Sequence, residues 1–297
     1  MIQHLEDPTQ LVWLVTGASS GLGLALVKCI LARGDRVVAT ARDPSKLDAL
    51  MPVLDVLPGR LYITYLDVTD TSEKIQSIMD AAILRWGRID VLVNNAGIVE
   101  AIGPAEELGT TDLFRSNMET NFFGVVKCTN AILPHMRARR EGTIVIVGSR
   151  SAFKTDAPGI GAYGASKAAA HAYGETIASE LSRLNIRVTI VVPGLFRTPF
   201  NYASPVKPKF DDYNFFHDHA PAYLKMRRTT PEAADPEKGM DVVVDVVRGE
   251  GRAVGTGEWP LWLALGDDAL TDVKFKLSNI GKTLAVWGDA GRGLKIE

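Results

Sequence analysis

The chain has 297 residues, of which 46% are hydrophobic and 23% are charged, as is ordinary for a soluble globular protein. The formal net charge of −2 gives no overall field that favours nucleic acid or an anionic membrane, and no apolar run is long enough to span a bilayer. The first eight residues lack the basic start and apolar segment of a secretory signal. The two cysteines, Cys29 and Cys128, lie in apolar helical contexts. We therefore predict a cytoplasmic protein with reduced cysteines.

Six short apolar segments alternate with helical patterns through the first two thirds of the chain. The segments expected as strands are residues 11–15, 35–41, 61–66, 90–97 with its turn, 143–148 and 186–192. The segments expected as helices are residues 24–31, 71–86, 113–140 and 163–184. In the third of these helices, Pro134 predicts a break. Strands that are apolar throughout are typical of a parallel sheet that is covered on both faces.

The sequence therefore predicts an α/β chain with a Rossmann-like, doubly wound fold. Its mostly parallel seven-stranded sheet would carry helices on both faces. We expect residues 260–265 to supply the seventh strand and residues 268–287 to form a final helix. No low-complexity linker or repeat divides the chain, so we predict a single dinucleotide-binding domain over residues 1–297.

Residues 198–240 differ from this regular pattern because they are rich in proline and aromatic residues. We interpret them as an inserted region that folds over an apolar substrate as a lid. A dimer contact or a small separate core is the alternative. Within this region His217 and His219 flank Asp218, but no further spaced His or Cys accompanies them. We therefore expect a solvated loop there and no metal site.

A glycine turn follows the first predicted strand, at Gly17, Gly21 and Gly23. A strand, a glycine turn and a helix start form the layout that holds a pyrophosphate. Gly17 can adopt backbone angles that a Cβ would forbid, and the other two glycines let the helix approach the phosphates closely. The free N–H groups of the helix start then face the anion.

Polar residues stand at the carboxyl end of every one of the first six predicted strands. In open α/β sheets, ligands bind beyond these ends, which predicts one site instead of scattered surface residues. The residues at the six ends are Thr16, Arg42, Asp67, Asn94, Ser149 and Pro193.

Tyr163 and Lys167 are spaced four residues apart in a predicted helix. Residues at this spacing lie on one face, which puts the ammonium beside the phenol ring. A nearby cation favours the phenolate and lowers the tyrosine pKa from its ordinary value of about 10. Tyr163 is therefore a candidate to exchange a proton with a substrate oxygen.

Taken in order, these motifs resemble those of a short-chain dehydrogenase/reductase, over about residues 10–200. The matching motifs are Thr16-Gly17-x-x-x-Gly21-x-Gly23, Asp67, Asn94-Asn95-Ala96-Gly97, Asn121, Tyr163-x-x-x-Lys167, and Pro193-Gly194 with Thr198. The resemblance implies hydride transfer between a nicotinamide ring and an alcohol or carbonyl carbon. In that reading Tyr163 is the acid-base, and Lys167 binds the ribose hydroxyls and tunes Tyr163.

The resemblance also implies a role for Asn121, which would sit in the kink of the long helix and hold a water that links Lys167 to solvent. Asp67 would contact the adenine, Asn94 the adenosine side, and Thr198 the nicotinamide amide or diphosphate. The full set of implied cofactor-binding residues is Gly17, Ser19, Ser20, Gly21, Leu22, Gly23, Arg42, Asp67, Asn94, Tyr163, Lys167, Pro193 and Thr198.

The end of the second strand favours NADP(H) over NAD(H). An NAD enzyme needs a carboxylate there, but this chain has Ala41 followed by Arg42, with Lys46 nearby. A carboxylate would repel a 2′-phosphate, whereas Arg42 can pair with it through a fork of N–H donors. Asp43 is a competing feature, because it either turns inward or pairs with Arg42.

The chain departs from the family pattern at the catalytic serine, which normally stands thirteen positions before the tyrosine. That position is Arg150, flanked by Ser149 and Ser151. Either serine could reach the substrate oxygen if the loop is reshaped, and we favour Ser149 as the catalytic residue. Otherwise Arg150 is itself the donor, binds an anionic substrate, or points away.

We therefore predict an NADP(H)-dependent oxidoreductase that interconverts a ketone and a secondary alcohol on a small, mostly apolar molecule. The alternatives are a dehydration, isomerisation or cyclisation on the same fold, or an NADP(H)-binding sensor or scaffold without catalysis. We expect no nucleic-acid partner and no membrane span. The helices over residues 113–140 and 163–184 resemble those that pair between subunits in this family, which implies a homodimer or homotetramer.

Overall fold

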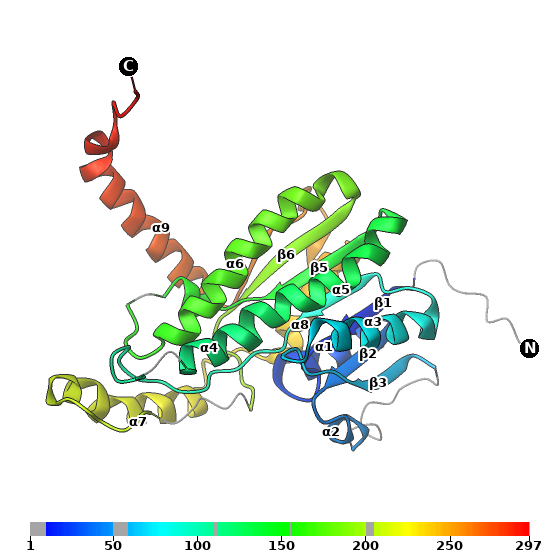
Figure 1. The fold of residues 1–297 in the computed structure, drawn as a ribbon, viewed down its shortest axis with the longest axis horizontal. Helices are drawn as coiled ribbons and strands as arrows, with labels where there is room; N and C mark the ends of the chain where they lie inside the picture. The colour runs from blue at the N-terminus through cyan, green and yellow to red at the C-terminus, as the bar shows by residue number, and fades with distance from the viewer. Residues whose placement is uncertain (1–9, 50–58, 110–111, 155, 200–204, 297) are drawn as a thin grey trace, which may run out of the picture.

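The computed structural model describes residues 10–49, 59–109, 112–154, 156–199 and 205–296, and its centre is one seven-stranded sheet (Figure 1). The strand order is β3-β2-β1-β4-β5-β6-β7, and every neighbouring pair is parallel. This confirms the predicted doubly wound sheet. The strands are β1 (Val12–Val15), β2 (Arg36–Ala41), β3 (Leu61–Tyr65), β4 (Val91–Asn94), β5 (Gly142–Val147), β6 (Ile186–Pro193) and β7 (Trp262–Leu265).

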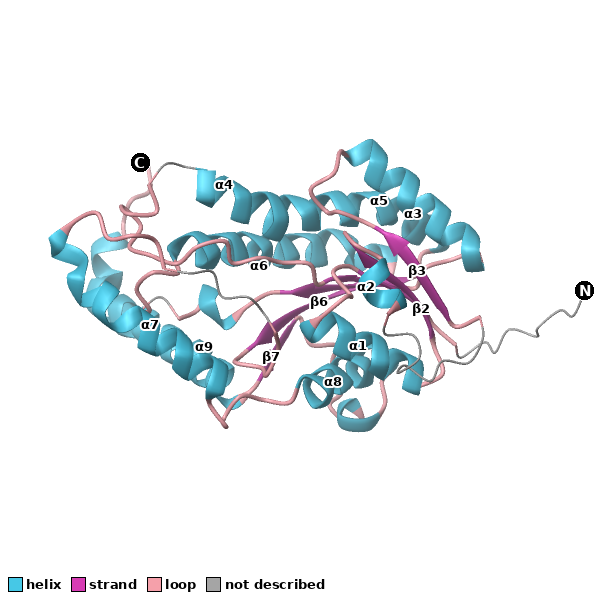
Figure 2. Cartoon of the chain, turned by 90° about the horizontal axis from the view of Figure 1, so that it is seen from below, coloured by secondary structure: helices cyan, strands magenta, loops and turns pink. Residues whose placement is uncertain are grey.

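Helices cover the sheet on both faces, as Figure 2 shows. On one face lie α1 (Gly21–Ala32) and α8 (Pro236–Arg248). On the other lie α3 (Ser72–Trp86), α5 (Gly124–Arg139) and α6 (Gly161–Leu181). Alternate residues of β1 serve the two cores: Trp13 packs in one cluster and Leu14 in the other. Because both faces are buried, the strands are apolar throughout.

The remaining α-helices are shorter or lie at the edges of the sheet. They are α2 (Ser45–Asp48), α4 (Asp112–Met118), α7 (Asn214–Thr229) and α9 (Asp267–Trp287). Residues 198–240, expected to be irregular, thus contain the helix α7; residues 200–204 lie outside the described part of the chain. No described helix is both long and apolar enough to cross a bilayer.

The predicted break at Pro134 is wrong, because α5 continues through it. A proline inside a helix removes one backbone hydrogen bond, but Cys128, Ile132 and Met136 on the same helix are buried against the sheet. This packing outweighs the local cost of the proline. The irregularity occurs earlier, where a π-helical turn at Glu119–Phe123 joins α4 to α5.

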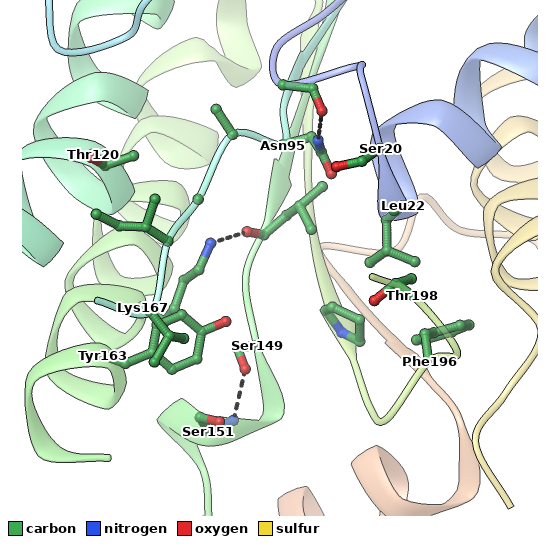
Figure 3. Close-up of a pocket in the computed structure, with 18 of the residues that line it drawn as sticks. Ser20, Leu22, Asn95, Thr120, Ser149, Ser151, Tyr163, Lys167, Phe196 and Thr198 are labelled. Atoms are coloured by element: carbon green, nitrogen blue, oxygen red, sulfur yellow. Dashed lines mark hydrogen bonds between the residues drawn. The ribbon is translucent and has the colours of Figure 1, made fainter. Parts of the chain in front are cut away.

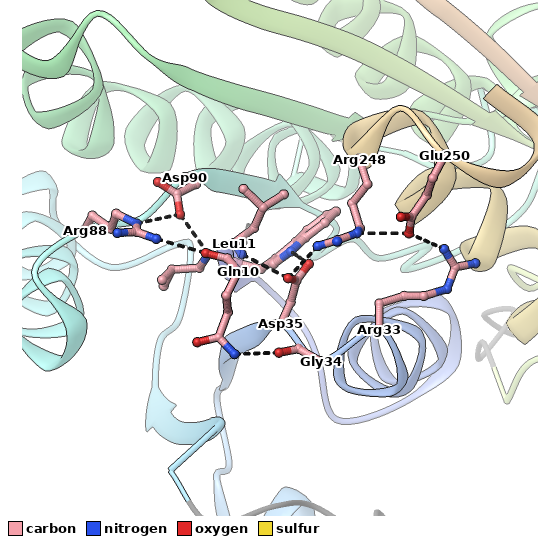
Figure 4. Close-up of polar contacts among 11 residues, drawn as sticks. Gln10, Leu11, Arg33, Gly34, Asp35, Arg88, Asp90, Arg248 and Glu250 are labelled. Atoms are coloured by element: carbon pink, nitrogen blue, oxygen red, sulfur yellow. Dashed lines mark hydrogen bonds and ion pairs between the residues drawn. The ribbon is translucent and has the colours of Figure 1, made fainter. Parts of the chain in front are cut away.

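A buried carboxylate, that of Asp35, joins β1 to the end of α8 (Figure 4). Asp35, just before β2, accepts hydrogen bonds from the Leu11 N–H and the Trp13 Nε1–H at 2.9 Å each. It also accepts one from Arg248, at the end of α8, at 2.7 Å. Arg248 in turn donates to Glu250, which also accepts from Arg33. This network fixes α8 against β1 and α1.

Candidate active site

A cavity of about 330 Å³ opens at the carboxyl edge of the sheet (Figure 3). It is lined by most of the residues that the sequence singles out, although these come from all parts of the chain. The predicted residues that line it are Gly17, Ser19, Ser20, Gly21, Leu22, Arg42, Asp67, Ser149, Tyr163, Lys167, Pro193 and Thr198. The structure therefore brings these side chains and turns together, while Gly23, Asn94 and Asn121 lie behind the wall.

The glycine turn has the conformation that its sequence requires. Gly17 and Gly21 have φ angles of +65° and +56°, which L-residues rarely adopt. A Cβ on Gly17 would lie only 2.9 Å from the Ala96 Cα. The helix α1 then begins at Gly21, the preceding Ser20 makes no side-chain capping hydrogen bond, and the first turn has no acidic residue. Its leading N–H groups are left for an anion, so the turn fits a pyrophosphate.

Gly23 has a different role from the one expected. It does not line the cavity, and a Cβ there would lie 2.4 Å from the Gly17 carbonyl oxygen and 2.5 Å from Asn95 Nδ2. Gly23 therefore lets α1 pack against the turn and does not itself approach a phosphate.

At the end of β4, it is Asn95 and not the predicted Asn94 that lines the cavity. The Asn94 side chain is buried and donates to Thr129 Oγ1 at 3.1 Å, so it faces away from the cavity. Asn95 lines the cavity, and its Nδ2 donates to the backbone oxygens of Thr16 and Gly17. Asn95 thus holds the glycine turn in place. A one-residue shift at a strand end reverses which face a side chain reaches.

The far end of the cavity, beyond β2, carries charged residues of both signs. Arg42 and Lys46 line it, and Arg42 is exposed with no hydrogen bond or ion pair to any described residue. Asp43 is occupied, since its carboxylate accepts from the Ser45 N–H at 3.2 Å and the Ser45 hydroxyl at 2.5 Å. Asp43 therefore does not pair with Arg42, and it lines the cavity while bonded to Ser45. Asp67, the next polar residue along the wall, accepts from the backbone and side chain of Thr69.

Tyr163 and Lys167 lie side by side on α6, as their spacing predicts (Figure 3). Lys167 is only 4% exposed, and its ammonium donates to the Val147 carbonyl oxygen at 2.8 Å. Burial lowers the pKa of Lys167 to about 8. The phenol of Tyr163 points from the same helix face into the cavity.

Asn121 occupies the π-helical turn behind this pair. Its Oδ1 accepts from the Ile98 N–H at 2.8 Å, and its Nδ2 donates to the Ile98 carbonyl and to Ser166 Oγ. A Cβ on Gly97 would lie 3.2 Å from both Asn121 Oδ1 and Lys167 Nζ. Asn121 therefore supports the wall next to Lys167 through these three hydrogen bonds.

The residue that presents a hydroxyl beside Tyr163 is Ser149 (Figure 3). Ser149 is the cap of a short 3₁₀ turn, and its Oγ accepts from the Ser151 N–H at 3.1 Å. Arg150 also lines the cavity, and its guanidinium forms ion pairs with Asp268 and Asp272 at the start of α9. Ser149, Arg150 and Ser151 all line the cavity, so Ser149 as the catalytic residue stays a prediction.

The end of the cavity beside Tyr163 is apolar. A helix that the sequence did not predict, α7, forms much of its wall. Phe216, Ala220 and Leu224 of α7 are buried and line the cavity. They form a small cluster with Val99 and Ile102, against which Tyr163 packs. The spacing i, i+4, i+8 along α7 is the sequence pattern that could have indicated this helix.

The predicted solvated loop at His217 is instead part of the anchor of α7. His217 Nε2 lies 2.5 Å from Glu107 Oε2, and Glu107 Oε1 accepts from the N–H groups of Lys209 and Phe210 at 2.9 and 3.0 Å. Burial raises the pKa of the Glu107 carboxyl, but these N–H donors and the His217 ring outweigh it and hold that pKa below its usual range. Three bonds to one buried carboxylate therefore fasten α7 over the cavity.

The sequence and the fold were compared with known proteins. The family model described as short chain dehydrogenase matches residues 11–207. An oxidoreductase of Botryotinia fuckeliana, BOA17, is 32% identical over 259 residues, which is 87% of this chain and 90% of the relative. The crystal structure of a short-chain dehydrogenase from Streptomyces avermitilis superposes with a TM-score of 0.84 at 34% identity, covering 98% of this chain and 100% of that one.

Two further relatives carry a named cofactor. An NADP-dependent 3-hydroxy acid dehydrogenase of Shigella flexneri is 34% identical over 185 residues, 62% of this chain and 72% of its own. The closed form of serine dehydrogenase, solved in complex with NADP⁺, has a TM-score of 0.69 at 28% identity and covers 86% of this chain and 94% of that one. These names describe the relatives.

Proposed function

Since the chain belongs to the short-chain dehydrogenase/reductase family of oxidoreductases, we propose that it uses NADP(H) to interconvert a ketone and a secondary alcohol on a small, mostly apolar molecule. The observation that carries this proposal is the arrangement of one cavity. Tyr163, Lys167 and Ser149 meet at its apolar end, and the uncapped start of α1 and Arg42 lie toward its other end.

The cofactor would be held by residues that line this cavity. The glycine turn and the start of α1 would bind the diphosphate, Asp67 would contact the adenine, and Lys167 with Tyr163 would bind the nicotinamide ribose. Pro193 and Thr198 would lie along the nicotinamide side. When bound, the cofactor supplies or accepts the hydride at the substrate carbon. Arg42, without a protein partner among the described residues, supports NADP(H) over NAD(H).

The protein's own groups would manage the substrate oxygen. In the reducing direction Tyr163 gives its hydroxyl proton to that oxygen, and Ser149 donates a hydrogen bond to it. The Lys167 ammonium stabilises the phenolate that Tyr163 leaves, and Asn121 supports the wall beside it. Phe216, Ala220 and Leu224 exclude water over the reacting carbon.

Arg150 occupies the usual serine position, which is the feature that favours reactions other than hydride transfer. Its guanidinium is paired with Asp268 and Asp272, and Ser149 presents a hydroxyl to the cavity. These contacts favour the ketone–alcohol reaction over an arginine-assisted dehydration, isomerisation or cyclisation. The retention of Ser149, Tyr163 and Lys167 in one cavity favours catalysis over a sensor role.

The decisive experiment replaces Tyr163 by Phe. We expect turnover of ketones to fall at least about 100-fold, because the proton donor is lost. The dissociation constant of NADPH, measured by its fluorescence, should change little. The matched control is Tyr173→Phe, on the same helix but away from the cavity. Equal activity of Tyr163→Phe and the control would refute the mechanism.

We also propose that the protein is a cytoplasmic homodimer or homotetramer. Several large apolar side chains of α9 are exposed, including Leu277, Leu284 and Trp287, and such surfaces usually contact another chain. Light scattering should then give a mass of two or four times 32.2 kDa, and a monomer at that mass would contradict the proposal.

A further inference from the structure

The start of α9 is tied to the end of β5 by a cluster of charges next to the candidate active site. Arg150 Nε lies 3.2 Å from Asp268 Oδ2, and its Nη1 pairs with Asp272. Lys154 Nζ reaches the other oxygen of Asp272 at 3.5 Å. The side chains of Arg150 and Asp272 are only 12% and 11% exposed, so these ion pairs are poorly screened by solvent.

Asp268 also connects α9 to the end of β6. Its Oδ2 accepts the Leu195 N–H at 2.8 Å, directly after the Pro193-Gly194 pair that lines the cavity. A Cβ on Gly194 would lie 1.9 Å from Asp268 Oδ1, so the two segments are in close contact. One helix start therefore holds the ends of two neighbouring strands that form the cavity wall.

Ser149 is fixed from both sides by this arrangement. On one side its N–H donates to His171 Nε2 at 3.2 Å, and the imidazole is buried between Phe153 and Trp262. On the other side the next residue, Arg150, is held by ion pairs with the two carboxylates. With both neighbours fixed, the Ser149 hydroxyl is left facing the cavity near Tyr163.

We propose that Asp268 and Asp272 are positioning residues that hold the Arg150 guanidinium in ion pairs and so place the Ser149 hydroxyl beside the reacting oxygen. This inference rests on the proposed function of Ser149. Without the carboxylates, the turn Arg150–Ala152 loses its anchor on α9, and the Ser149 hydroxyl is no longer held in place.

A double-mutant cycle on kcat tests whether the two aspartates act through Ser149. The first arm is Ser149→Ala, for which we expect a loss of about 100-fold, as for removal of one oxyanion donor. The second arm is the pair Asp268→Asn with Asp272→Asn, for which we expect a loss of about 10-fold or more with little change in the NADPH dissociation constant. The matched control is Asp267→Asn, in the same first turn but outside the ion pairs.

Combining the two arms distinguishes positioning from a general structural effect. If the aspartates act through the serine, replacing them in the Ser149→Ala background should lower kcat almost no further. The effects of residues that act as one unit are not additive. An undiminished second loss in that background would overturn the proposal. So would full activity of the aspartate variant.

A measurement that needs no turnover separates this inference from the proposed function. With ¹⁵N-labelled histidine, the Nε2 resonance of His171 reports the hydrogen bond from the Ser149 N–H. We expect the aspartate variant, but not Asp267→Asn, to shift this resonance and to speed exchange of the Ser149 amide. Unchanged signals would overturn the inference even if the enzyme is active. Inactive wild type, or active Ser149→Ala, would instead count against the proposed function, and the NMR signals would still decide the role of the aspartates.

Discussion

Lys167 is a buried ammonium in the wall of the site, an environment very different from that of a free lysine in water. Its only hydrogen-bond partner among the described residues is the Val147 carbonyl, and burial lowers its pKa from 10.5 to about 8. Between these two pH values the unfolded chain binds a proton that the folded chain does not. The folded state is therefore destabilised by this charge below pH 8 and gains stability as pH rises from 8 to 10.5.

We predict that this pH dependence disappears in Lys167→Met. Relative to that variant, the wild type should gain up to about 3 kcal/mol of unfolding free energy between pH 8 and 10.5, since one pKa unit corresponds to about 1.4 kcal/mol. Urea unfolding of both proteins across this range measures the difference. A difference that is constant with pH would show that Lys167 titrates normally in the folded protein.

Arg42 carries the prediction on cofactor choice. A charge-assisted contact to the 2′-phosphate is worth about 1.5–3 kcal/mol, but Arg42 is exposed, so we expect the lower part of this range. Arg42→Ala should weaken NADPH binding about 10-fold and leave NADH binding nearly unchanged. Arg115→Ala, an exposed arginine on α4 outside the cavity, is the control. Equal losses for both cofactors would argue against a phosphate contact.

Among the secondary-structure elements, α7 determines the shape of the substrate end. It contacts the rest of the cavity through the apolar face of Phe216, Ala220 and Leu224, and the Glu107 carboxylate fastens its beginning. The proposed cofactor end of the cavity is formed by the glycine turn and Arg42, and α7 lies at the other end. Loosening α7 should therefore weaken substrate binding much more than NADPH binding.

We therefore predict a selective effect of Glu107→Ala. The loss of three hydrogen bonds to one carboxylate should raise KM for an apolar ketone about 10-fold or more while the NADPH dissociation constant stays within about two-fold. Asp218→Ala, an exposed position on α7 beside His217, should behave as wild type. If NADPH binding weakens as much as KM rises, α7 is not a separate substrate lid.

At the scale of the whole molecule, the network around Asp35 joins parts of the chain that are more than two hundred residues apart (Figure 4). Asp35 is 1% exposed, so removal of a partner leaves a buried charge less well compensated. Arg248→Met should lower the unfolding free energy by about 2–4 kcal/mol, because the Leu11 and Trp13 donors remain.

The control for this prediction is another ion pair in the same chain. Arg292 and Asp289 are 81% and 90% exposed, so Arg292→Met should change the unfolding free energy by less than about 0.5 kcal/mol. Chemical denaturation of both variants compares the two costs. Similar small effects would mean that the Asp35 network adds little to the stability of the fold.

The sequence by itself determined the parallel sheet, the glycine turn and the pairing of Tyr163 with Lys167. Each depends on a local regularity: strands apolar on both faces, a turn that needs positive φ, and a four-residue spacing on one helix face. Such regularities are visible in one stretch of chain, and the structure keeps all three.

Only the tertiary structure decided that Asn95, and not Asn94, faces the cavity, and that the Arg150 guanidinium is held in ion pairs beside Ser149. It also decided that Lys167 is buried and that α7 forms the apolar wall. These features depend on contacts between distant residues, such as Arg150 with Asp272, which are 122 positions apart. At a strand end, a shift of one residue reverses the direction in which a side chain points. This direction is set by how separate elements pack against one another, and no local sequence pattern encodes that packing.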